Sequence, residues 1–350
     1  MFDCHAPALF QPLTHWHMPA ATKVSFIDKA PDYKIETMPS GECRGRIPDA
    51  LAGKRVDQAL AILFPDFSRS RLQQWIREGH VELSGARCSP KDKVSGGETL
   101  LVRCQPDADE LAYRPEDIPL RIVHEDSSVL VVDKPAGLVV HPGSGNWSGT
   151  LLNALLQHSP ANATLPRAGI VHRLDKNTSG LLVVAKTLVA HTDLVRQMQA
   201  RSVKREYAAL VHGAVTSAGT IEAPLGRHPR ERTKMAVVAN GKAATTHYTV
   251  VERGAGWTLL TCRLETGRTH QIRVHLSSIG HGLIGDPVYK SQPVFPDLAQ
   301  AARDFHRQAL HAQSLGFRHP VSAQAMQWHA PLPQDLETLL DQIRNVQPAQ

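Results

Sequence analysis

The sequence predicts a protein of the α+β class, in which two folded domains follow a long N-terminal extension. At 350 residues and 42% hydrophobic content, the chain is long and apolar enough for two or three domains with a real core. Residues 55–63 repeat apolar side chains with the period of a helix. Residues 246–252 and 257–267 alternate apolar and polar side chains instead, which favours antiparallel strands.

Charge and cysteine content favour some classes of function over others. A net charge of +6 and a pI near 9.1 favour a polyanionic partner. No apolar run approaches 18 residues, so we expect no membrane span. The five cysteines form no CxxC pair and the histidines form no HExxH motif, so we expect neither a disulfide framework nor a bound metal. A reducing cytoplasm is the simplest setting.

Residues 1–48 differ from the rest of the chain. They contain six prolines, scattered polar residues and no sustained periodicity. We predict a mostly disordered extension with a short strand near its end.

Residues 49–104 predict a small basic domain. An amphipathic helix comes first, Ser68 opens a second helix, and Gly79 ends it. Short strands joined by glycine-containing turns follow. Arg69 and Arg71 fall on the exposed first turns of the second helix, where they suit phosphate contacts. A solvated charged face is the alternative interpretation of this helix.

Residues 105–119 are acidic, contain proline and lack a period, so we predict a linker. Residues 120–345 then predict the larger domain. A strand, a turn and a second strand span residues 122–137, and a helix with a leucine stripe covers residues 151–156. Residues 181–185, reading LLVVA, fit a strand that is buried on both faces.

His172, Arg173 and Asp175 stand just ahead of that buried strand. A buried strand is a rigid support, and a carboxylate flanked by cations can stay ionised in a dry cleft. Such a carboxylate suits a nucleophilic or proton-transferring role. From these residues alone, the plainer alternative stays open that Asp175 caps a turn or pairs with Arg173 on the surface.

A basic patch follows a helix predicted over residues 191–199. Arg201, Lys204 and Arg205 stand just ahead of Tyr207. A tyrosine beside a cluster of cations can stack on a base while phosphates are held nearby. The local pattern YAALV also fits a core tyrosine in a strand.

Two further features lie near the end of this domain. Residues 226–237 predict a basic loop that suits a second RNA-facing edge. Thr269 is predicted as the N-cap of a helix that runs to Ile279 and stops at Gly280. Arg268 directly precedes that cap, at a strand-to-helix junction where a side chain can reach into a cleft.

Several of these stretches together resemble the RluA-type pseudouridine synthase family. They read DKPAGLVVHPG (133–143), GIVHRLDKNTSGLLVVAKT (169–187), KREYAALV (204–211) and GRTHQIRVHLSSIGH (267–281). Residues 49–104, with RVDQALA, SRSRLQQWIREGHV and a Gly-Gly turn, resemble the S4 RNA-binding domain. The resemblance covers about residues 55–336. The long extension is the one departure from the family pattern, and Met38 lies close to where the family's chains begin.

The resemblance implies a fold, an activity and a set of site residues. The fold is a mixed, largely antiparallel sheet with a central cleft, preceded by the S4-like domain. Asp175 is the catalytic residue, Arg268 pairs with it, and Tyr207 stacks on the target uracil. Arg173 takes the space that the flipped base leaves, and Arg205 is among the RNA-binding residues. The family needs neither cofactor nor metal.

The resemblance further implies large-subunit 23S ribosomal RNA, or its ribosomal precursor particle, as the partner, at the hairpin loop of the helix 69 region. Transfer RNA is the runner-up substrate, and a non-catalytic ribosome assembly factor is a rival from another class. A glycoside hydrolase would need a second carboxylate beside Asp175, and none is evident. The sequence leaves open whether Asp175 attacks the sugar C1′ or the base C6, or assists elimination. We expect a cytoplasmic monomer without membrane contact.

Overall fold

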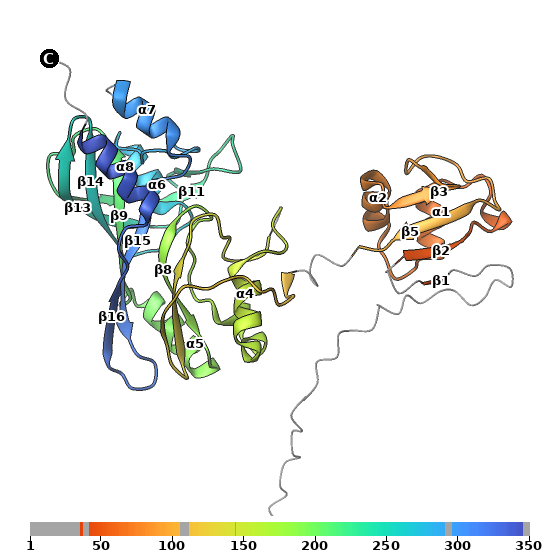
Figure 1. The fold of residues 1–350 in the computed structure, drawn as a ribbon, viewed down its shortest axis with the longest axis horizontal. Helices are drawn as coiled ribbons and strands as arrows, with labels where there is room; N and C mark the ends of the chain where they lie inside the picture. The colour runs from red at the N-terminus through yellow and green to blue at the C-terminus, as the bar shows by residue number, and fades with distance from the viewer. Residues whose placement is uncertain (1–35, 38–41, 106–111, 144, 291–295, 346–350) are drawn as a thin grey trace, which may run out of the picture. The chain divides into compact units, whose positions relative to one another are not determined.

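The computed structural model describes residues 36–37, 42–105, 112–143, 145–290 and 296–345 (Figure 1). The chain divides into two compact units, Met1–Asp107 and Ala108–Gln350, each with its own hydrophobic core. Most of the extension predicted over residues 1–48 lies outside the described residues. Within the described residues, no helix is both long and apolar enough to cross a membrane.

The first unit is built on an antiparallel sheet with the strand order β1-β2-β5-β3-β4. Its described strands are β1 (Glu36–Thr37), β2 (Glu42–Arg46), β3 (Val81–Leu83), β4 (Ala86–Arg87) and β5 (Thr99–Arg103). A short 3₁₀ turn, η1 (Asp49–Leu51), leads from β2 to the helices.

Helices α1 (Val56–Leu63) and α2 (Arg69–Glu78) confirm the two predicted helices of this unit. The Ser68 hydroxyl accepts the Arg71 N–H at 3.3 Å, as an N-cap does. Gly79 ends α2 with φ 81°, the left-handed conformation that glycine adopts without strain. The apolar faces of both helices join the sheet in one core.

Strand β2 corrects the predicted start of this domain at residue 49. The segment ECRGR was placed in the extension, yet it pairs with β5 from Glu42↔Arg103 to Arg46↔Thr99. Cys43, its one apolar side chain, is 1% exposed in the core. The short strand predicted near the end of the extension therefore belongs to the first unit, because pairing with a distant partner, and not a local period, assigns it to this sheet.

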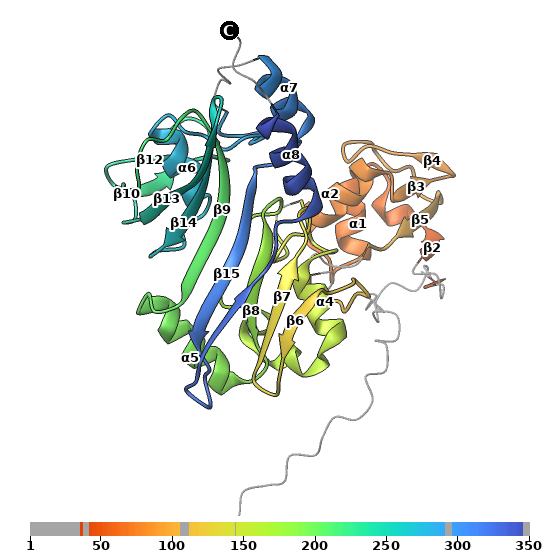
Figure 2. The same ribbon diagram turned by 60° about the vertical axis from the view of Figure 1, so that its left-hand side comes forward.

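The second unit is built on a mixed sheet with the strand order β10-β13-β14-β9-β15-β8-β7-β6, with β16 paired to β15. All of these pairs are antiparallel except β8 with β15, which confirms the predicted largely antiparallel α+β class. The strands are β6 (Ile122–Glu125), β7 (Val129–Lys134), β8 (Ser179–Ala185), β9 (Lys204–His212), β10 (Gly219–Glu222), β13 (Thr245–Gly254), β14 (Trp257–Leu264), β15 (Leu310–Arg318) and β16 (Ala325–His329). Figure 2 shows β9 and β15 side by side in the middle of this sheet.

Strand β8 is buried along its whole length, as the sequence predicts. Leu182 and Val184 join the core on one face of the sheet, and Leu181 and Val183 join the core on the other. Because successive strand side chains point to opposite faces, both faces must be covered, which explains the continuous apolar run.

Helices cover the two faces of this sheet. The helix α4 (Leu151–His158) matches the predicted leucine-rich helix and packs in the first of these cores. The helix α5 (Leu188–Gln199) packs in the second and begins three residues earlier than predicted, because Thr187 caps it. The remaining helical segments are η2 (Pro160–Thr164), η3 (Pro166–Gly169), α6 (Gln271–Ser278), α7 (Pro296–Asp304) and α8 (Gln334–Arg344).

The start of β8 lies very close to β15. Gly180 has φ +113°, and a Cβ added there would clash with the backbone of Ala312. Only glycine fits this contact, which holds the mouth of β8 in place. The loop that carries Asp175 enters β8 at this point.

The segment predicted as a linker, residues 105–119, is partly outside the described residues. Its last part packs on the second unit, where Asn153 on α4 donates to the Arg114 carbonyl at 2.8 Å. Glu116 accepts the Gly149 N–H at 3.1 Å. From Ala112 onward, therefore, the chain packs on the second unit.

Candidate active site

A cavity of about 920 Å³ lies in the second unit, beside the mouth of β8. Its wall includes every site residue that the sequence selected in this part of the chain: Arg173, Asp175, Arg205, Tyr207 and Arg268. These residues come from three separate stretches of sequence, and the sheet brings them together. A smaller cavity of about 420 Å³ shares Arg173 and Asp175 with the first.

His172 anchors the front of the loop that carries Asp175. The Val183 N–H donates to His172 Nε2 at 3.0 Å, so this nitrogen is an acceptor and the ring proton sits on Nδ1. Burial, with the charge of Arg205, lowers the pKa of His172 to about 3. His172 is therefore a neutral support and not a general acid at neutral pH.

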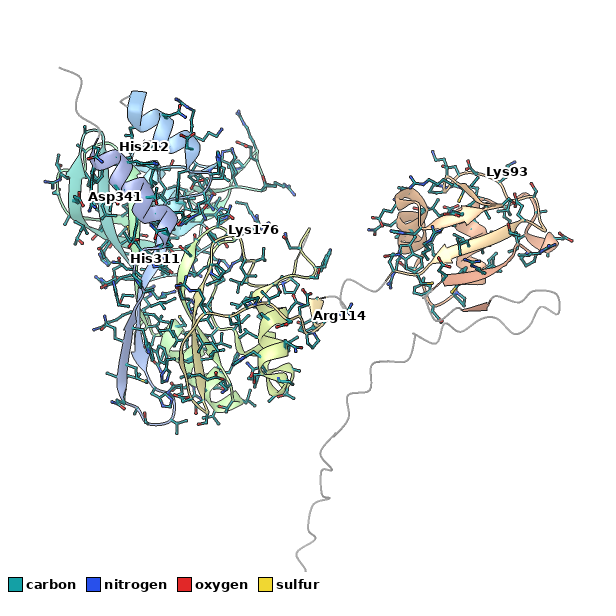
Figure 3. The ribbon with its side chains drawn as sticks, in the orientation of Figure 1. Lys93, Arg114, Lys176, His212, His311 and Asp341 are labelled. Carbon is teal, nitrogen blue, oxygen red and sulfur yellow. The ribbon has the colours of Figure 1, made fainter. Side chains whose placement is uncertain are left out.

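Lys134 holds the back of the same loop. Its ammonium group is buried at the end of β7 and donates to the carbonyls of Pro135, Leu138 and Lys176 at 2.8, 2.9 and 3.1 Å. Burial lowers its pKa to about 7, although the negative charge of Asp175 opposes that shift. Because Lys176, labelled in Figure 3, directly follows Asp175, these bonds fix the backbone that presents the carboxylate.

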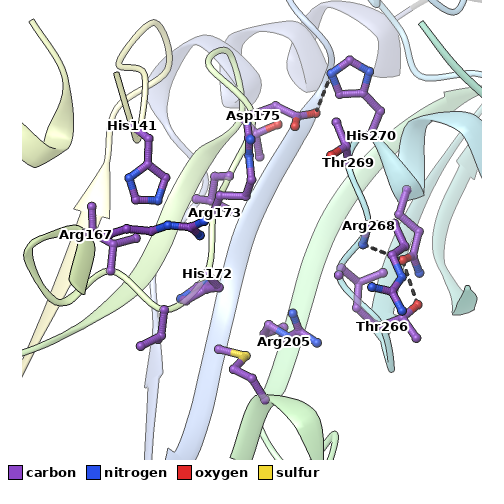
Figure 4. A pocket seen from close by; sticks show the side chains of 18 of the residues that line it. His141, Arg167, His172, Arg173, Asp175, Arg205, Thr266, Arg268, Thr269 and His270 are labelled. Atoms are coloured by element: carbon purple, nitrogen blue, oxygen red, sulfur yellow. Dashed lines mark hydrogen bonds and ion pairs between the residues drawn. The ribbon is translucent and has the colours of Figure 1, made fainter. Parts of the chain in front are cut away.

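The carboxylate of Asp175 is mostly covered but still reaches the cavity, with 16% of the side chain exposed. Its Oδ2 atom accepts a hydrogen bond from Arg273 Nη1 at 3.0 Å. His270 Nε2 lies 4.0 Å from the same oxygen (Figure 4). Among the described residues, Oδ1 has no hydrogen-bond partner, so one oxygen is held and the other is open to a ligand.

Arg273 is itself rigidly held. Its Nε and Nη2 atoms form a two-pronged pair with Asp286, at 2.8 and 2.9 Å, and its guanidinium lies 5.1 Å from the ring centre of Tyr289. Burial alone would lower the pKa of Arg273, but its carboxylate partners raise it, so the charge is permanent. A fixed cation of this kind keeps Asp175 oriented.

In this structure the arginine that bonds Asp175 is Arg273, and not Arg268 as predicted. Arg268 Nε donates to the Ala243 carbonyl at 3.4 Å, and its backbone N–H donates to Gln271 Oε1 at 3.0 Å. Figure 4 shows Arg268 on the cavity wall beside Thr266, with His270 nearer to Asp175.

The reason is a shift in the start of helix α6. Thr269 was predicted as the N-cap, but the helix begins at Gln271, after His270 adopts the left-handed conformation with φ 57°. His270 and the first turn of the helix, which carries Arg273, therefore face Asp175, and Arg268 does not. The helix ends at Ser278, one residue before the predicted end at Ile279, which is 39% exposed.

A sequence signal for Arg273 existed. It stands between Ile272 and Val274 in a helix that is buried from Gln271 to Leu276. A cation flanked by two apolar residues in a buried helix requires a carboxylate partner, and Asp286 follows 13 residues later.

Tyr207 and Arg205 come from β9 and share the face that lines the cavity. Tyr207 is 5% exposed, and burial raises the pKa of its hydroxyl, which stays protonated. Arg205 is 7% exposed and donates to the Glu265 carbonyl at 3.5 Å. Its buried Nε has no partner among the described residues, so a hydrogen-bond donor remains available at this wall.

Arg173 lies on the wall opposite Arg268, with His141 and Arg167 (Figure 4). Its side chain is exposed. Burial, followed by the charges of Arg167 and Arg173, lowers the pKa of His141 to about 4. This part of the wall therefore carries positive charge through arginine and leaves the histidine neutral, which suits an anionic ligand.

The two arginines predicted for RNA binding in the first unit already have partners there. Arg69 donates two hydrogen bonds to Asp57, at 3.1 and 2.8 Å, yet 48% of its side chain is exposed. Arg71 donates to the Gln105 carbonyl at 2.7 Å and lies over the rings of Phe67 and Trp75.

Comparison with known proteins identifies the family. Residues 128–278 match the model of the RNA pseudouridylate synthase family, and residues 54–100 match the S4 domain. The chain is 56% identical over 300 residues to the ribosomal large subunit pseudouridine synthase D of Nitrosomonas europaea, covering 86% of this chain and 87% of that protein. It is 54% identical to the protein of the same name from Pseudomonas aeruginosa, covering 85% and 94%.

A solved structure shares the fold. The human RNA pseudouridylate synthase domain containing 4 is 24% identical, with a TM-score of 0.52, over 69% of this chain and 97% of that one. At that level of identity the likeness supports the fold of the second unit.

Proposed function

The chain belongs to the RNA pseudouridylate synthase family, and from that premise we propose that it isomerises uridines of large-subunit ribosomal RNA to pseudouridine. Relatives named ribosomal large subunit pseudouridine synthase D are 51 to 56% identical over more than four fifths of the chain. The single observation that carries the proposal is the geometry of Asp175. Its carboxylate stands at the mouth of a buried strand, held through one oxygen and open through the other.

The reaction detaches uracil from its ribose at N1 and rejoins it through C5, so the N1–C1′ bond breaks and a C5–C1′ bond forms. The C5 hydrogen then leaves the base, and N1 takes up a proton. In our proposal Oδ1 of Asp175 acts on the nucleotide, at C1′, at C6 or by assisting elimination. All three routes require an ionised, oriented carboxylate, which the permanent cation of Arg273 supports.

The remaining cavity residues have binding roles in this proposal. The target base must leave its stack, which costs a few kcal/mol that protein contacts offset. Arg173, exposed on the wall, takes the space that the base leaves. Tyr207 stacks on the uracil, and Arg205 supplies the free Nε donor. Arg268 binds the RNA backbone at the opposite wall, in place of the role first predicted for it.

The first unit supplies RNA affinity in this proposal. Residues 54–100 match the S4 domain, and the exposed half of Arg69 carries a positive charge at the start of α2. The guanidinium of Arg71 lies over the rings of Phe67 and Trp75, so we assign Arg71 a secondary role in RNA binding at the same surface.

A glycoside hydrolase is the enzyme class that this site fits less well. Hydrolysis of that kind uses two carboxylates that flank the bond. Among the described residues that line the larger cavity, the second carboxylate is Glu265, which already pairs with His247 at 2.7 Å and Arg201 at 3.3 Å. We therefore favour isomerisation by one carboxylate.

We further propose a cytoplasmic monomer that takes part in ribosome biogenesis, without a cofactor, and that acts at the hairpin loop of the helix 69 region. Transfer RNA is the competing substrate. The test is a map of pseudouridines in total RNA from cells with and without this protein, repeated in cells that carry only Asp175→Asn. We expect large-subunit sites to disappear in both mutants. Loss confined to transfer RNA would reject the ribosomal substrate, and an unchanged map would reject the activity.

A further inference from the structure

His270 occupies an unusual position at the edge of the cavity. It is the residue before α6, and its φ of 57° is a left-handed conformation that a non-glycine residue adopts at a cost of about 1 kcal/mol or more. The ring borders both cavities and faces Asp175, with Nε2 4.0 Å from Oδ2 (Figure 4). The predicted site did not include this residue.

The hydrogen bonds behind His270 determine where its proton lies. The Met235 N–H donates to the Tyr289 hydroxyl oxygen at 2.9 Å. The hydroxyl directs its own proton to its other partner, His270 Nδ1, also at 2.9 Å. This geometry favours Nδ1 as the acceptor and therefore the N–H of the neutral ring on Nε2, the nitrogen that faces Asp175.

The ring has reason to remain neutral. Burial lowers the pKa of His270, and the charge of Asp175 opposes this shift while Arg273 adds to it. A neutral Nε2–H donor differs from a second cation, because it can bond the carboxylate without neutralising its charge.

We propose that His270 is a positioning residue for the reaction assigned above. Its Nε2–H closes onto Oδ2 of Asp175 when RNA fills the cavity, so that Arg273 and His270 together hold one oxygen and leave Oδ1 to the nucleotide. The proposal rests on Asp175 being the catalytic carboxylate. The separation of 4.0 Å must shorten by about 1 Å to reach hydrogen-bond length.

The same contacts connect His270 to a basic hairpin. Met235 begins β12 (Met235–Val237), which pairs with β11 (Leu225–Arg227) in the segment predicted as a loop. This hairpin carries Arg227, Arg230, Arg232 and Lys234. RNA phosphates bound there would steady the strand whose N–H directs the proton of Tyr289.

The first test compares His270→Ala with His270→Gln in single-turnover reactions on an rRNA fragment. Glutamine places an N–H₂ group close to the position of Nε2, whereas alanine removes the donor. We expect alanine to lower the rate constant about 10- to 100-fold with RNA affinity within about threefold, and glutamine to restore most of the loss. His281→Ala is the matched control, since His281 bonds a backbone carbonyl outside both cavities.

The second test uses Tyr289→Phe, which keeps the ring under Arg273 but removes the hydroxyl. Nδ1 of His270 then loses its donor, and both tautomers become accessible. In protein labelled with ¹⁵N at its 19 histidines, the His270 signal is identified by its loss in His270→Gln. We expect the ¹⁵N chemical shifts of His270 to be those of the Nε2–H tautomer in the wild type and of a mixture of tautomers in Tyr289→Phe. The reaction of Tyr289→Phe should be severalfold slower.

These outcomes separate the proposal from its premise. A wild-type protein without pseudouridine formation would reject the function, while the tautomer measurement would still stand. A folded His270→Ala with full activity, or a loss of RNA affinity at an unchanged rate constant, would overturn the role of His270. So would a glutamine variant as slow as alanine, or an Nδ1–H tautomer in the wild type.

Discussion

Two aspartates, one in each unit, pair with arginine and yet differ in what they can do. Asp57 in the first unit is fully covered and accepts from Arg55, Arg69 and Gln73, through both oxygens, at 2.6 to 3.1 Å. Asp175 in the second unit has one oxygen bonded to Arg273 and the other open to a cavity. A local sequence window does not distinguish them, since each stands among arginines.

Both carboxylates lie near cations, so the difference between them is whether each oxygen already accepts a hydrogen bond. In the proposed function, that difference distinguishes a structural carboxylate from a catalytic one. The bonds from Arg69 and Gln73 join Asp57 on α1 to α2, and those from Arg55 come from the start of α1, so the charge of Asp57 stabilises the packing of two helices. Asp286 is a second saturated case, with Arg273 and two backbone N–H groups as donors. Asp175 keeps an unbonded oxygen where a ligand can reach it.

The largest effect on the reaction rate should come from removing the charge of Asp175, with removal of the charge of Asp57 as the comparison. Asp175→Asn keeps the size of the side chain and should lower pseudouridine formation by at least about 10³-fold, with RNA affinity within a few-fold. Asp57→Asn should leave the rate constant on saturating RNA nearly unchanged. The release of the C5 hydrogen from labelled uridine in the RNA measures both. Substantial turnover by Asp175→Asn would remove the contrast between the two sites.

The second prediction concerns two arginines of the candidate active site, Arg273 and Arg268. Arg273→Lys cannot bond Asp286 and Asp175 at once, because it loses the planar fork, so we expect activity to fall about 100-fold. Arg268→Lys retains a cation whose present partner is a carbonyl at 3.4 Å, and we expect a change of a few-fold, mainly in RNA affinity. If Arg268→Lys is the more damaging of the two, the bound complex uses the pairing that the sequence suggested.

Much of this site could be predicted from sequence because its signals are local. The run LLVVA specifies a strand buried on both faces, and HRLD places Asp175 at its mouth. The motif resemblance then selected Tyr207, Arg205 and Arg173, and all of them reach the same cavity.

The errors have two physical causes, a pairing distant in sequence and a local backbone conformation that leaves no pattern in the sequence. Strand β2 is defined by its pairing with β5, some 60 residues away, and the partner of Asp175 by a left-handed turn at His270. An αL residue without glycine has no strong sequence signal. The tautomer of His270 likewise depends on Met235 and Tyr289.

The third prediction measures the structural role of Asp57. Asp57→Asn should destabilise the first unit by about 2 kcal/mol, below the cost of breaking a deeply buried pair, because Arg55 and Arg69 are partly exposed. For a domain of this size the melting temperature would fall roughly 10 °C. Calorimetry of the full chain should show one shifted transition, with Glu82→Gln as a surface-pair control. An unchanged melting temperature would mean that the hydrogen bonds from Arg55, Arg69 and Gln73 make no net contribution to the stability of the first unit.

The same aspartate should give the first unit an acid-sensitive stability. Burial alone would raise the pKa of Asp57, but the bonds from Arg69 and Gln73 and the charge of Arg55 lower it overall. A lowered folded-state pKa contributes stability above the unfolded value near 4, and this is lost as pH falls through the folded value. The wild type and Asp57→Asn should therefore differ at pH 7 and converge towards pH 2. If the two proteins still differed in stability at pH 2, the destabilisation by Asp57→Asn would come from the changed shape of the side chain and not from its lost charge.

The smallest effect should come from shortening the chain, which tests whether the two units divide affinity and chemistry as their aspartates suggest. Removing residues 1–107 should leave a folded second unit with RNA affinity about tenfold weaker and a shallower dependence on salt, because fewer phosphates are neutralised. Removing residues 1–37 deletes β1, a two-residue edge strand, and leaves β2 paired with β5, so affinity and stability should change little. Titration of both truncations against one rRNA fragment at several salt concentrations gives the comparison. If the short truncation weakened binding as much as the long one, the RNA-binding surface would lie in the extension, and the saturated charges around Asp57 would serve only to hold the fold.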